Sequence, residues 1–342
     1  MPQSHPQQYD QAAALLQSAR RVVIGGHPIM DGDALGCTLA LASTLRAAGR
    51  EVLTVTQDLQ AGKYTFLEGA DQLVPLNSLP LVLTGFDACI VVDCGAESRA
   101  RALLQRLAPG TPVINLDHHV DNPGFGDAAV VMPKASSSGE VVYNTLRRAG
   151  LELTKGAAEA LFCAIVTDTG RFMFNNSTPE SYRIVAQLVE QHGLQVGDLT
   201  RQIYRNKSVQ RLKLEAMVGQ TLQTRMDGKV AIARVTLEML NQTGSSDAEA
   251  NELVTFPGAL AGVMVSLLFR ELGPQELKVS FRSEGQMPVN DLAAKFHGGG
   301  HLRAAGAHIK GRAVAEVEAE IIAALEAQLA ATLASTGGAI IC

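Results

Sequence analysis

Three polar side chains with the chemistry of metal ligands crowd one short stretch of the chain, residues 24–36, which has the sequence IGGHPIMDGDALG. They are His27, Asp31 and Asp33. The apolar run at residues 21–26 predicts a buried strand before them, and the apolar spacing of residues 34–49 predicts a helix after them. In an open parallel sheet, ligands bind at the carboxyl ends of the strands. One aspartate could merely cap the helix, but a cap needs one carboxylate, whereas this turn has two and an imidazole.

Further aspartates and histidines follow other predicted elements. They are Asp93, which ends an apolar strand at residues 87–94; Asp117-His118-His119, which follow a strand at residues 112–116; and Asp168, which follows an apolar helix at residues 157–167. Taken alone, Asp168 could equally cap the turn after it. Strands and helices alternate through this half of the chain, which favours a parallel sheet whose strand ends share one edge.

Six of these side chains offer oxygen or nitrogen donors, about the number that two divalent ions share. They are His27, Asp31, Asp33, Asp93, His118 and Asp168. Four carboxylates would offset the charge of two such ions, and a set without thiolate favours Mn²⁺ or Mg²⁺ over structural zinc. Asp93 stands alone at its strand end and is the candidate for a bridging ligand. Because two metal ions about 3.5–4 Å apart can activate water and clamp a phosphoryl group, phosphoester hydrolysis is the predicted reaction class.

The composition limits the kind of substrate. The chain has 342 residues, a formal net charge of −5, 4% aromatic residues and no Trp. Net acidity disfavours capture of long nucleic acid, and few aromatics disfavour a long single-strand groove. The basic stretch from Arg201 to Lys213 is more often a solvated helix face than an RNA contact. We therefore predict a short or small substrate and no long duplex nucleic acid as partner.

Cysteine usage and hydropathy indicate the compartment. Five cysteines are scattered without a CxxC pair, which fits reduced thiols better than a disulfide framework. No apolar run approaches the roughly 18 residues of a membrane span, and the N-terminus lacks a signal pattern. We expect a cytoplasmic protein with no membrane partner.

Two domains are expected in the α/β class. An N-terminal parallel-sheet domain over residues 1–195 would carry the polar cluster, a connecting helix would cover 196–224, and a smaller α/β domain would occupy 225–342. Within the last, we predict a strand at 229–240, helical periodicity over 248–272 with a break at Pro257, a strand at 276–282 and a helix at 313–334. Its glycine run at Gly298, Gly299 and Gly300 could be a simple loop, but it could also let backbone N–H groups approach phosphate.

Taken together, the motifs HPIMDGD, VVD, LDHH, VTDTG and HGGGHLRAAG resemble those of the DHH phosphoesterase family over nearly the whole chain. The resemblance implies a DHH catalytic domain followed by a DHH-associated, nucleotide-binding domain. It implies that two Mn²⁺ ions, or Mg²⁺ as an alternative, are bound. Their ligands would be His27, Asp31, Asp33, Asp93, His118 and Asp168. It also implies that His119 and Asp93 serve catalysis, His119 by facing the phosphate or leaving group. Substrate-binding residues are expected at Arg99, Ser280, Arg282, Gly298, Gly299, Gly300 and His301.

Two departures from the family pattern leave the set of metal ligands intact, and the one in the glycine run bears on substrate preference. Met30 stands where a proline usually precedes the first aspartate, and His297 replaces a glycine of the usual GGGGH run. The flanking sequences favour the bacterial or archaeal nano-RNase type, which degrades oligoribonucleotides of a few residues and dephosphorylates 3′-phosphoadenosine 5′-phosphate (pAp). A linear or cyclic dinucleotide phosphodiesterase, with pApA or c-di-AMP as substrate, is the alternative within the family. A nucleotide sensor without turnover is the alternative of another class, and a homodimer is possible.

Overall fold

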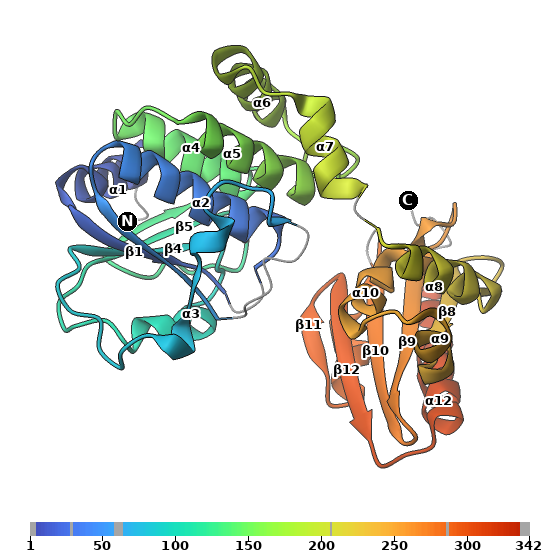
Figure 1. Cartoon of the computed structure of the whole chain (residues 1–342). Coiled ribbons are helices and arrows are strands. Elements are labelled where there is room, and N and C mark those ends of the chain that lie inside the picture. Colours follow the sequence, from blue (N-terminus) through green and yellow to red (C-terminus); the bar gives the residue numbers. More distant parts are fainter. Residues whose placement is uncertain (1–4, 28–29, 58–63, 206, 285–286, 336–342) are drawn as a thin grey trace. The chain divides into compact units, whose positions relative to one another are not determined.

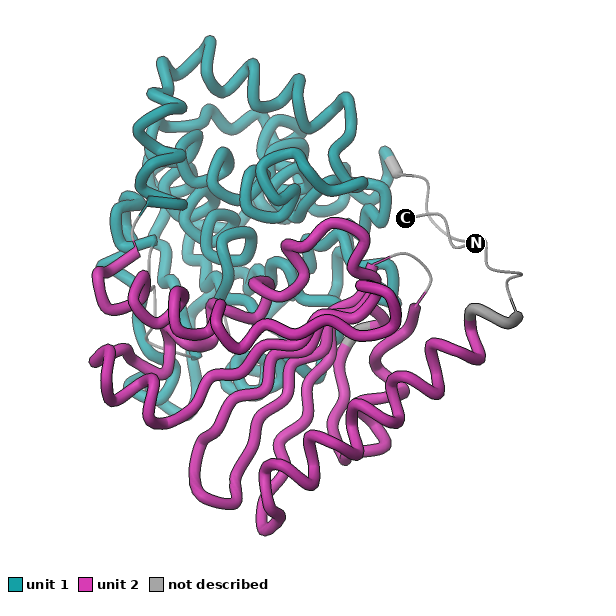
Figure 2. Tube along the Cα trace, turned by 90° about the vertical axis from the view of Figure 1, so that its right-hand side faces the viewer, with its two compact units in different colours: residues 1–206 teal, residues 207–342 magenta. Residues whose placement is uncertain are grey.

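The structure is a computed structural model that describes residues 5–27, 30–57, 64–205, 207–284 and 287–335. The chain divides into two compact units, Met1–Asn206 and Lys207–Cys342 (Figure 2). Both units are α/β, which confirms the predicted fold class. Each unit is described by itself below.

The first unit is built on a six-stranded sheet in the order β3-β2-β1-β4-β5-β6, with every pair of neighbouring strands parallel. The strands are β1 (Arg21–Gly25), β2 (Glu51–Thr56), β3 (Val74–Pro75), β4 (Ala88–Val92), β5 (Val113–Asp117) and β6 (Ala128–Val131). The central strand β4 is buried at all five positions, as a parallel sheet covered on both faces requires.

Helices cover the two faces of this sheet unequally (Figure 1). The larger core lies on the face with α1 (His5–Ser18), α2 (Gly32–Ala47), α4 (Ser138–Arg148) and α5 (Lys155–Asp168). The other face has a smaller core around α3 (Glu97–Leu104). Two further helices, α6 (Pro179–His192) and α7 (Val196–Tyr204), follow α5. Alternate strand residues serve the two cores: Ile90 and Val92 point into one, Cys89 and Val91 into the other.

Small residues let α2 and α5 approach closely. A Cβ atom on Gly32 would lie 2.4 Å from Oγ1 of Thr167, and one on Gly36 would lie 2.5 Å from the carbonyl oxygen of Ala160. The start of α2 therefore lies beside the end of α5, so the two helices run antiparallel. This contact brings the N-terminus of α2 next to Asp168, the last residue of α5.

The second unit has a mixed sheet in the order β11-β12-β10-β9-β8-β7, in which only β8 and β9 pair in parallel. Its strands are β7 (Gln223–Arg225), β8 (Val230–Val235), β9 (Val265–Gly273), β10 (Glu276–Ser283), β11 (Gly299–His301) and β12 (Ala304–Lys310). On one face α11 (Asn290–Lys295) and α12 (Val314–Ser335) pack against Leu277, Val279 and Phe281 of β10. A separate cluster forms around α8 (Val209–Gln220), α9 (Leu237–Thr243) and α10 (Asp247–Asn251).

Three predictions for this part of the chain are wrong in detail. The single connecting helix over 196–224 is two helices, α7 and α8, because α7 ends before Arg205 and Ser208 caps a new helix through the N–H of Arg211. The strand at 229–240 stops at Val235, where Thr236 caps α9. The helical stretch at 248–272 contains β9, whose continuous apolar run cannot be distinguished from a buried helix by periodicity.

Two observations bear on the expected compartment. Cys37, Cys89, Cys94 and Cys163 are buried and form no disulfide within the described part of the chain, whereas Cys342 lies outside it. Within the described ranges, no helix combines the length and the apolar character that crossing a membrane would require.

Candidate metal centre

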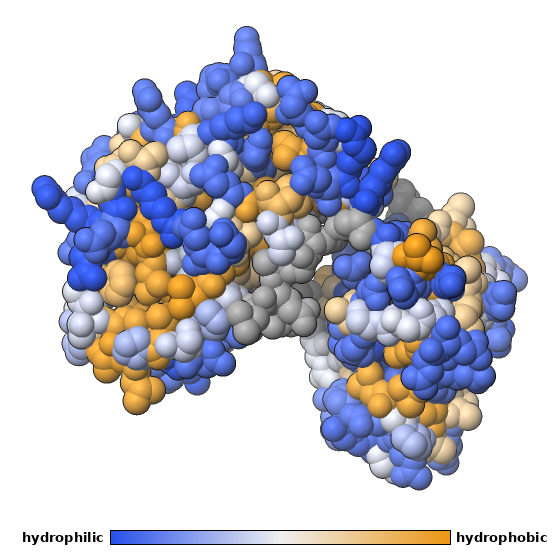
Figure 3. Space-filling view, viewed as in Figure 1, coloured by the Kyte–Doolittle hydropathy of each residue, from blue (hydrophilic) through white to orange (hydrophobic). Residues whose placement is uncertain are grey.

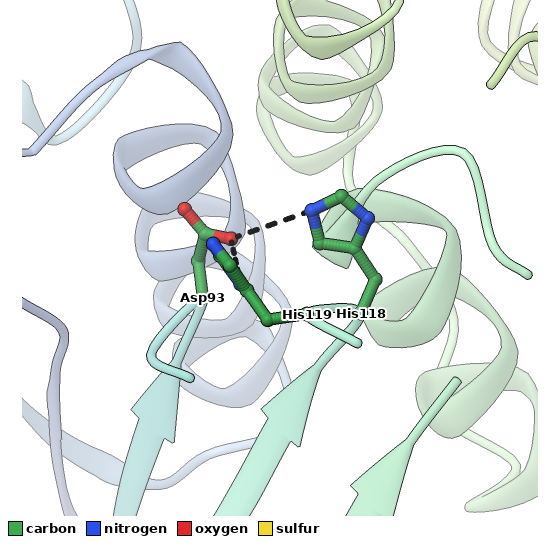
Figure 4. Close-up of side chains that lie close together, drawn as sticks. All are labelled: Asp93, His118 and His119. Carbon is green, nitrogen blue, oxygen red and sulfur yellow. Dashed lines mark ion pairs between the residues drawn. The ribbon is translucent and has the colours of Figure 1, made fainter. Parts of the chain in front are cut away.

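Side chains gather at the carboxyl ends of three adjacent strands of the first unit. His27 follows β1, Asp93 follows β4, and His118 and His119 follow β5. Asp93 has φ of 50°, a left-handed conformation that aspartate tolerates better than most residues. Figure 4 shows its carboxylate directed at both imidazoles from the neighbouring strand. The edge predicted from the sequence is thus the edge at which these side chains meet.

The N-terminus of α2 supplies two carboxylates with different surroundings. Asp31 caps the helix, accepting hydrogen bonds from the N–H groups of Asp33 and Ala34 at 3.1 and 3.0 Å. Asp33 is buried and accepts from the N–H groups of Ser138 and Gly139 at 2.7 and 2.9 Å, so it sits at the N-terminus of α4. The capping reading therefore holds for Asp31, and Asp33 is the additional carboxylate that capping of α2 does not explain.

Asp168 reaches the same place from the end of α5. Its Oδ2 atom lies 3.6 Å from Nε2 of His118 and accepts a hydrogen bond from Asn176 at 3.3 Å. Nε2 of His118 also lies 3.9 Å from Oδ2 of Asp33 and 3.9 Å from Oδ1 of Asp93. Nδ1 of His118 is 3.4 Å from the carbonyl oxygen of Ala135, which favours a proton on Nδ1 and a lone pair on Nε2.

The six predicted ligands fall into two groups of three. In one, donor atoms of His27, Asp31 and Asp93 lie within 4.8 Å of one another; in the other, those of Asp33, His118 and Asp168 do. A third group joins Asp93 to His118 and His119, so Asp93 touches both sides of the cluster. This arrangement matches two adjacent cation positions with Asp93 shared between them.

The electrostatics of the cluster suit a bound metal cation. Burial and the neighbouring carboxylates raise the pKa of Asp33 well above its ordinary value, and burial is also the main cause that raises the pKa of Asp168 to about 6. Burial alone would raise the pKa of Asp93, but the three histidines around it outweigh that effect and lower it. Among the described residues, the buried Nδ1 atom of His27 has no hydrogen-bond partner. Hard oxygen and imidazole donors that lack compensating charge suit divalent ions such as Mn²⁺ or Mg²⁺.

His119 is held by the buried carboxylate of Asp117, which buried amides hold in turn. The sequence analysis missed these amides. Its Nδ1 lies 2.8 Å from Oδ1 of Asp117, and Asn122 donates to the other oxygen of Asp117 at 2.6 Å and to Asn115 at 2.8 Å. The hydrogen bond to Asp117 is the main cause that raises the pKa of His119 to about 9, against the opposing effect of burial. The available signal was Asn115 itself, an amide in the middle of an apolar strand.

Arg99 lies on α3 of the same unit and is half-buried. Its positive charge acts on His119 and lowers the pKa of that imidazole in part. This predicted substrate residue therefore lies in the same unit as the cluster, where its charge acts on His119.

The other predicted substrate residues belong to the second unit, where a cavity of about 270 Å³ opens beside β10. It is lined by Ser280, Arg282 and Gly299, as expected, and also by Asn251, Val254, Lys278, Ala304, Ala305 and Gly306. Lys278, which the sequence analysis missed, shares one face of β10 with Ser280 and Arg282 and donates to Asn251 at 3.2 Å. The predicted strand at residues 276–282 already carried this signal, because side chains two positions apart in a strand share a face.

The glycine run has two different uses. A Cβ atom on Gly298 would lie 2.2 Å from the carbonyl oxygen of Gly306, and Gly300 has φ of 144°, so both positions require glycine for backbone packing. A Cβ atom on Gly299 would meet nothing within 4 Å, so its missing side chain leaves the cavity open. His301 ends β11, and its side chain lies outside what the structure describes.

The departure at His297 has a structural consequence. This exposed residue has φ of 57°, a conformation that glycine adopts without strain and histidine does not. Met30 is half-buried and packs against the larger core, whereas Pro28 lies outside the described residues.

Comparison with known proteins agrees with both units. Residues 21–165 match the model of the DHH family, N-terminal domain, and residues 227–331 match the DHHA1 domain. The chain is 31% identical over 298 residues to the bifunctional oligoribonuclease and PAP phosphatase NrnA of Thermus thermophilus, covering 85% of this chain and 84% of that protein. It is 25% identical to the cyclic-di-AMP phosphodiesterase GdpP of Geobacillus thermodenitrificans, covering 89% of this chain but 47% of GdpP.

A solved structure shows the same fold. The crystal structure of an exopolyphosphatase-related protein from Bacteroides fragilis superposes with a TM-score of 0.86 at 26% identity, covering 94% of this chain and 96% of that one. The two domain matches, the identity to NrnA and this superposition agree, and the chain belongs to the DHH family of phosphoesterases.

Proposed function

We propose that this chain is a metal-dependent phosphodiesterase that hydrolyses very short oligoribonucleotides to nucleoside monophosphates and also removes a phosphate from pAp. The observation that carries the proposal is the convergence of six metal-type ligands around Asp93. The similarity to NrnA, over 84% of that protein, supports the choice of substrates.

The proposed ligands are His27, Asp31, Asp33, Asp93, His118 and Asp168, with Mn²⁺ as the preferred ion. When bound, two such ions supply Lewis-acid activation of water and of the phosphoryl group. The protein's own contribution is positional: the caps and backbone contacts at Asp31 and Asp33 hold both carboxylates in place, and Ala135 orients His118.

His119 is proposed to act on the substrate directly. Asp117 fixes its ring orientation and favours its protonated form, so His119 can stabilise charge on a phosphoryl oxygen and supply a proton to the departing alkoxide. Nearby metal cations would lower its pKa from the value in the free protein, toward the range in which proton transfer is efficient.

The second unit is proposed to hold the substrate. Lys278 and Arg282 place two cationic side chains at one small cavity, next to the open backbone of Gly299. A cavity of about 270 Å³ lies at the small end of ligand sites and suits a part of a nucleotide rather than a long strand. Cytoplasmic location and a homodimer stay predictions from the sequence.

Hydrolysis of linear or cyclic dinucleotides is a second candidate, favoured by the similarity to GdpP. A sensor without turnover is less favoured, because a pure binder has no need to bury mutually repelling carboxylates around Asp33. Purified protein with Mn²⁺ should be given ApA, pApA, pAp, a pentanucleotide and c-di-AMP. Release of mononucleotide from the dinucleotides and of phosphate from pAp supports the proposal. Binding without hydrolysis of any of them would refute it in favour of the sensor.

A further inference from the structure

An apolar group stands exposed on the turn that follows α5. Met173 and Phe174 are 67% and 57% exposed, and Tyr182 of the following helix is 53% exposed. Tyr182 stacks on Phe172, with ring centroids 4.6 Å apart and planes 22° from parallel. Other apolar surface gathers over the loops beside α3 (Figure 3), so exposure alone does not single out this group. What distinguishes it is how the turn is held.

The turn has a strained and well-fixed backbone. Gly170, Arg171 and Phe172 have φ of 55°, 64° and 62°, three left-handed residues in succession of which two are not glycine. Such strain persists only where the surroundings impose it, and it clusters at functional sites. Here the N–H of Arg171 donates to Val166 at 2.8 Å, and that of Phe174 donates to Thr169 at 3.1 Å.

The ring of Phe174 lies directly on Gly170. A Cβ atom at position 170 would be 2.5 Å from the Cε2 and Cζ atoms of that ring, so only glycine permits the contact. One side of the ring is therefore supported by backbone while more than half of the side chain remains open to solvent.

Hydrogen bonds join this turn to the metal centre. Nδ2 of Asn176 donates to the backbone oxygen and to Oδ2 of Asp168, at 3.2 and 3.3 Å, and to the backbone oxygen of Ser136 at 2.8 Å. The N–H of Ser177 donates to the carbonyl oxygen of Phe174 at 3.1 Å. Phe174 and the Asp168 carboxylate thus belong to one hydrogen-bonded piece of structure, separated by only six positions in the chain.

We propose that Phe174, flanked by Met173, is a stacking platform for a nucleobase of a substrate whose phosphate lies at the metal centre. This inference rests on the proposed function, because a nucleotide is the chemical class that presents a phosphate and an aromatic face together. Stacking tolerates any base, since every base has a π-face, which suits an enzyme for short strands of mixed sequence. Phe174 would be a positioning residue that lowers KM without entering the chemical step.

The test compares Phe174→Ala, Phe174→Leu and Phe174→Tyr on the dinucleotide pApA and on its analogues with one base removed at either position. Stacking predicts that Ala and Leu raise KM for pApA by roughly 5- to 100-fold, that Tyr restores it, and that kcat changes little. On the analogue that lacks the stacked base, all variants should match the wild type. Leu81→Ala is the control, because Leu81 is 80% exposed but lies in the loop before β4, at the opposite edge of the sheet.

The outcomes separate the two claims. If the wild type cleaves pApA and Phe174→Leu retains its KM, the ring is not a stacking platform and the inference is overturned. If Phe174→Ala lowers turnover of pApA and of both base-deleted analogues equally, Phe174 has a structural role and the inference also fails. If the wild type itself releases no mononucleotide from pApA, the proposed function is what fails. Thermal unfolding of each variant checks that the turn still folds.

Discussion

Filling the cavity of the second unit should separate substrate capture from chemistry. Gly299→Val is the chosen change, because a Cβ atom there meets nothing within 4 Å and valine favours a strand. The three added carbons would occupy on the order of 80 Å³ if each needs about the volume of a water molecule. That is nearly a third of the 270 Å³ cavity.

Such a loss of volume would exclude a nucleotide group from beside Lys278 and Arg282 without touching the metal ligands. We expect kcat/KM for pApA to fall about 10- to 100-fold, mainly because KM rises. A fall of this size corresponds to the loss of a few kcal/mol of substrate-binding free energy. Hydrolysis of bis-p-nitrophenyl phosphate, which needs few contacts with this cavity, should change less than twofold. Gly298→Ala is the matched comparison: its Cβ atom would clash with the backbone of Gly306, so it should lower Tm, whereas Gly299→Val should not.

An equal loss on both esters by Gly299→Val, with Tm unchanged, would show that this cavity is not a dedicated substrate site. An unchanged kcat/KM on pApA would show the same more directly. Either result would refute the division of labour between the two units.

Three further predictions concern stability. Replacing His297 with glycine should stabilise the protein by about 0.5–1 kcal/mol in chemical unfolding, because φ of 57° strains histidine, whereas Ala294→Gly in α11 should destabilise it by about 1 kcal/mol. Gly36→Val should cost several kcal/mol or prevent folding, because its Cβ atom would lie 2.5 Å from the backbone of α5. In EDTA, Tm should rise by about 2–4 °C as the pH falls from 7 to 5.5. Carboxyls with a raised pKa, such as Asp168 with a pKa of about 6, bind protons more tightly in the folded state, and this binding adds on the order of 1 kcal/mol to the free energy of unfolding. Saturating Mn²⁺ should raise Tm at pH 7 and abolish that slope, and a Tm that instead falls on acidification would contradict the argument.

The direction of that pH effect follows from those groups of the cluster whose pKa is shifted. The fold gains stability as the pH falls through each raised carboxyl pKa, and the raised pKa of His119 acts in the same direction between about 9 and 6.5. Asp93 and Asp117 have lowered pKa values, so their contribution is lost only below their ordinary values near 4.

Local patterns were sufficient to predict the strands β1, β4 and β5, which carry the site in the first unit. Apolar strands that end in aspartate or histidine predicted one ligand edge, because parallel strands bring their carboxyl ends together. The sequence could not show that Gly36 lets α5 approach α2 and so delivers Asp168, since that contact joins segments more than a hundred residues apart. It also could not show that Asn122, which donates to Asn115 as well, holds Asp117, because the role of a buried amide is visible only once its partner is known.

The second unit was harder to predict because its strands are amphipathic in some places and apolar in others. The alternation of β10 was recognised, whereas the apolar run of β9 was mistaken for a helix. Ser280 and Arg282 were expected to bind substrate, whereas Lys278 on the same face of β10 was missed.

Metal stoichiometry of Asp93→Asn tests the central claim, a two-metal centre that shares one carboxylate. Asparagine also tolerates φ of 50°, so the fold should survive while the bridging charge is lost. Calorimetric titration with Mn²⁺ should find two sites in the wild type, both severely weakened in Asp93→Asn, whereas Asp31→Asn, which keeps the helix cap, should weaken one site and leave the other. Retention of one site of wild-type affinity in Asp93→Asn would contradict the shared ligand and the two-metal arrangement built on it.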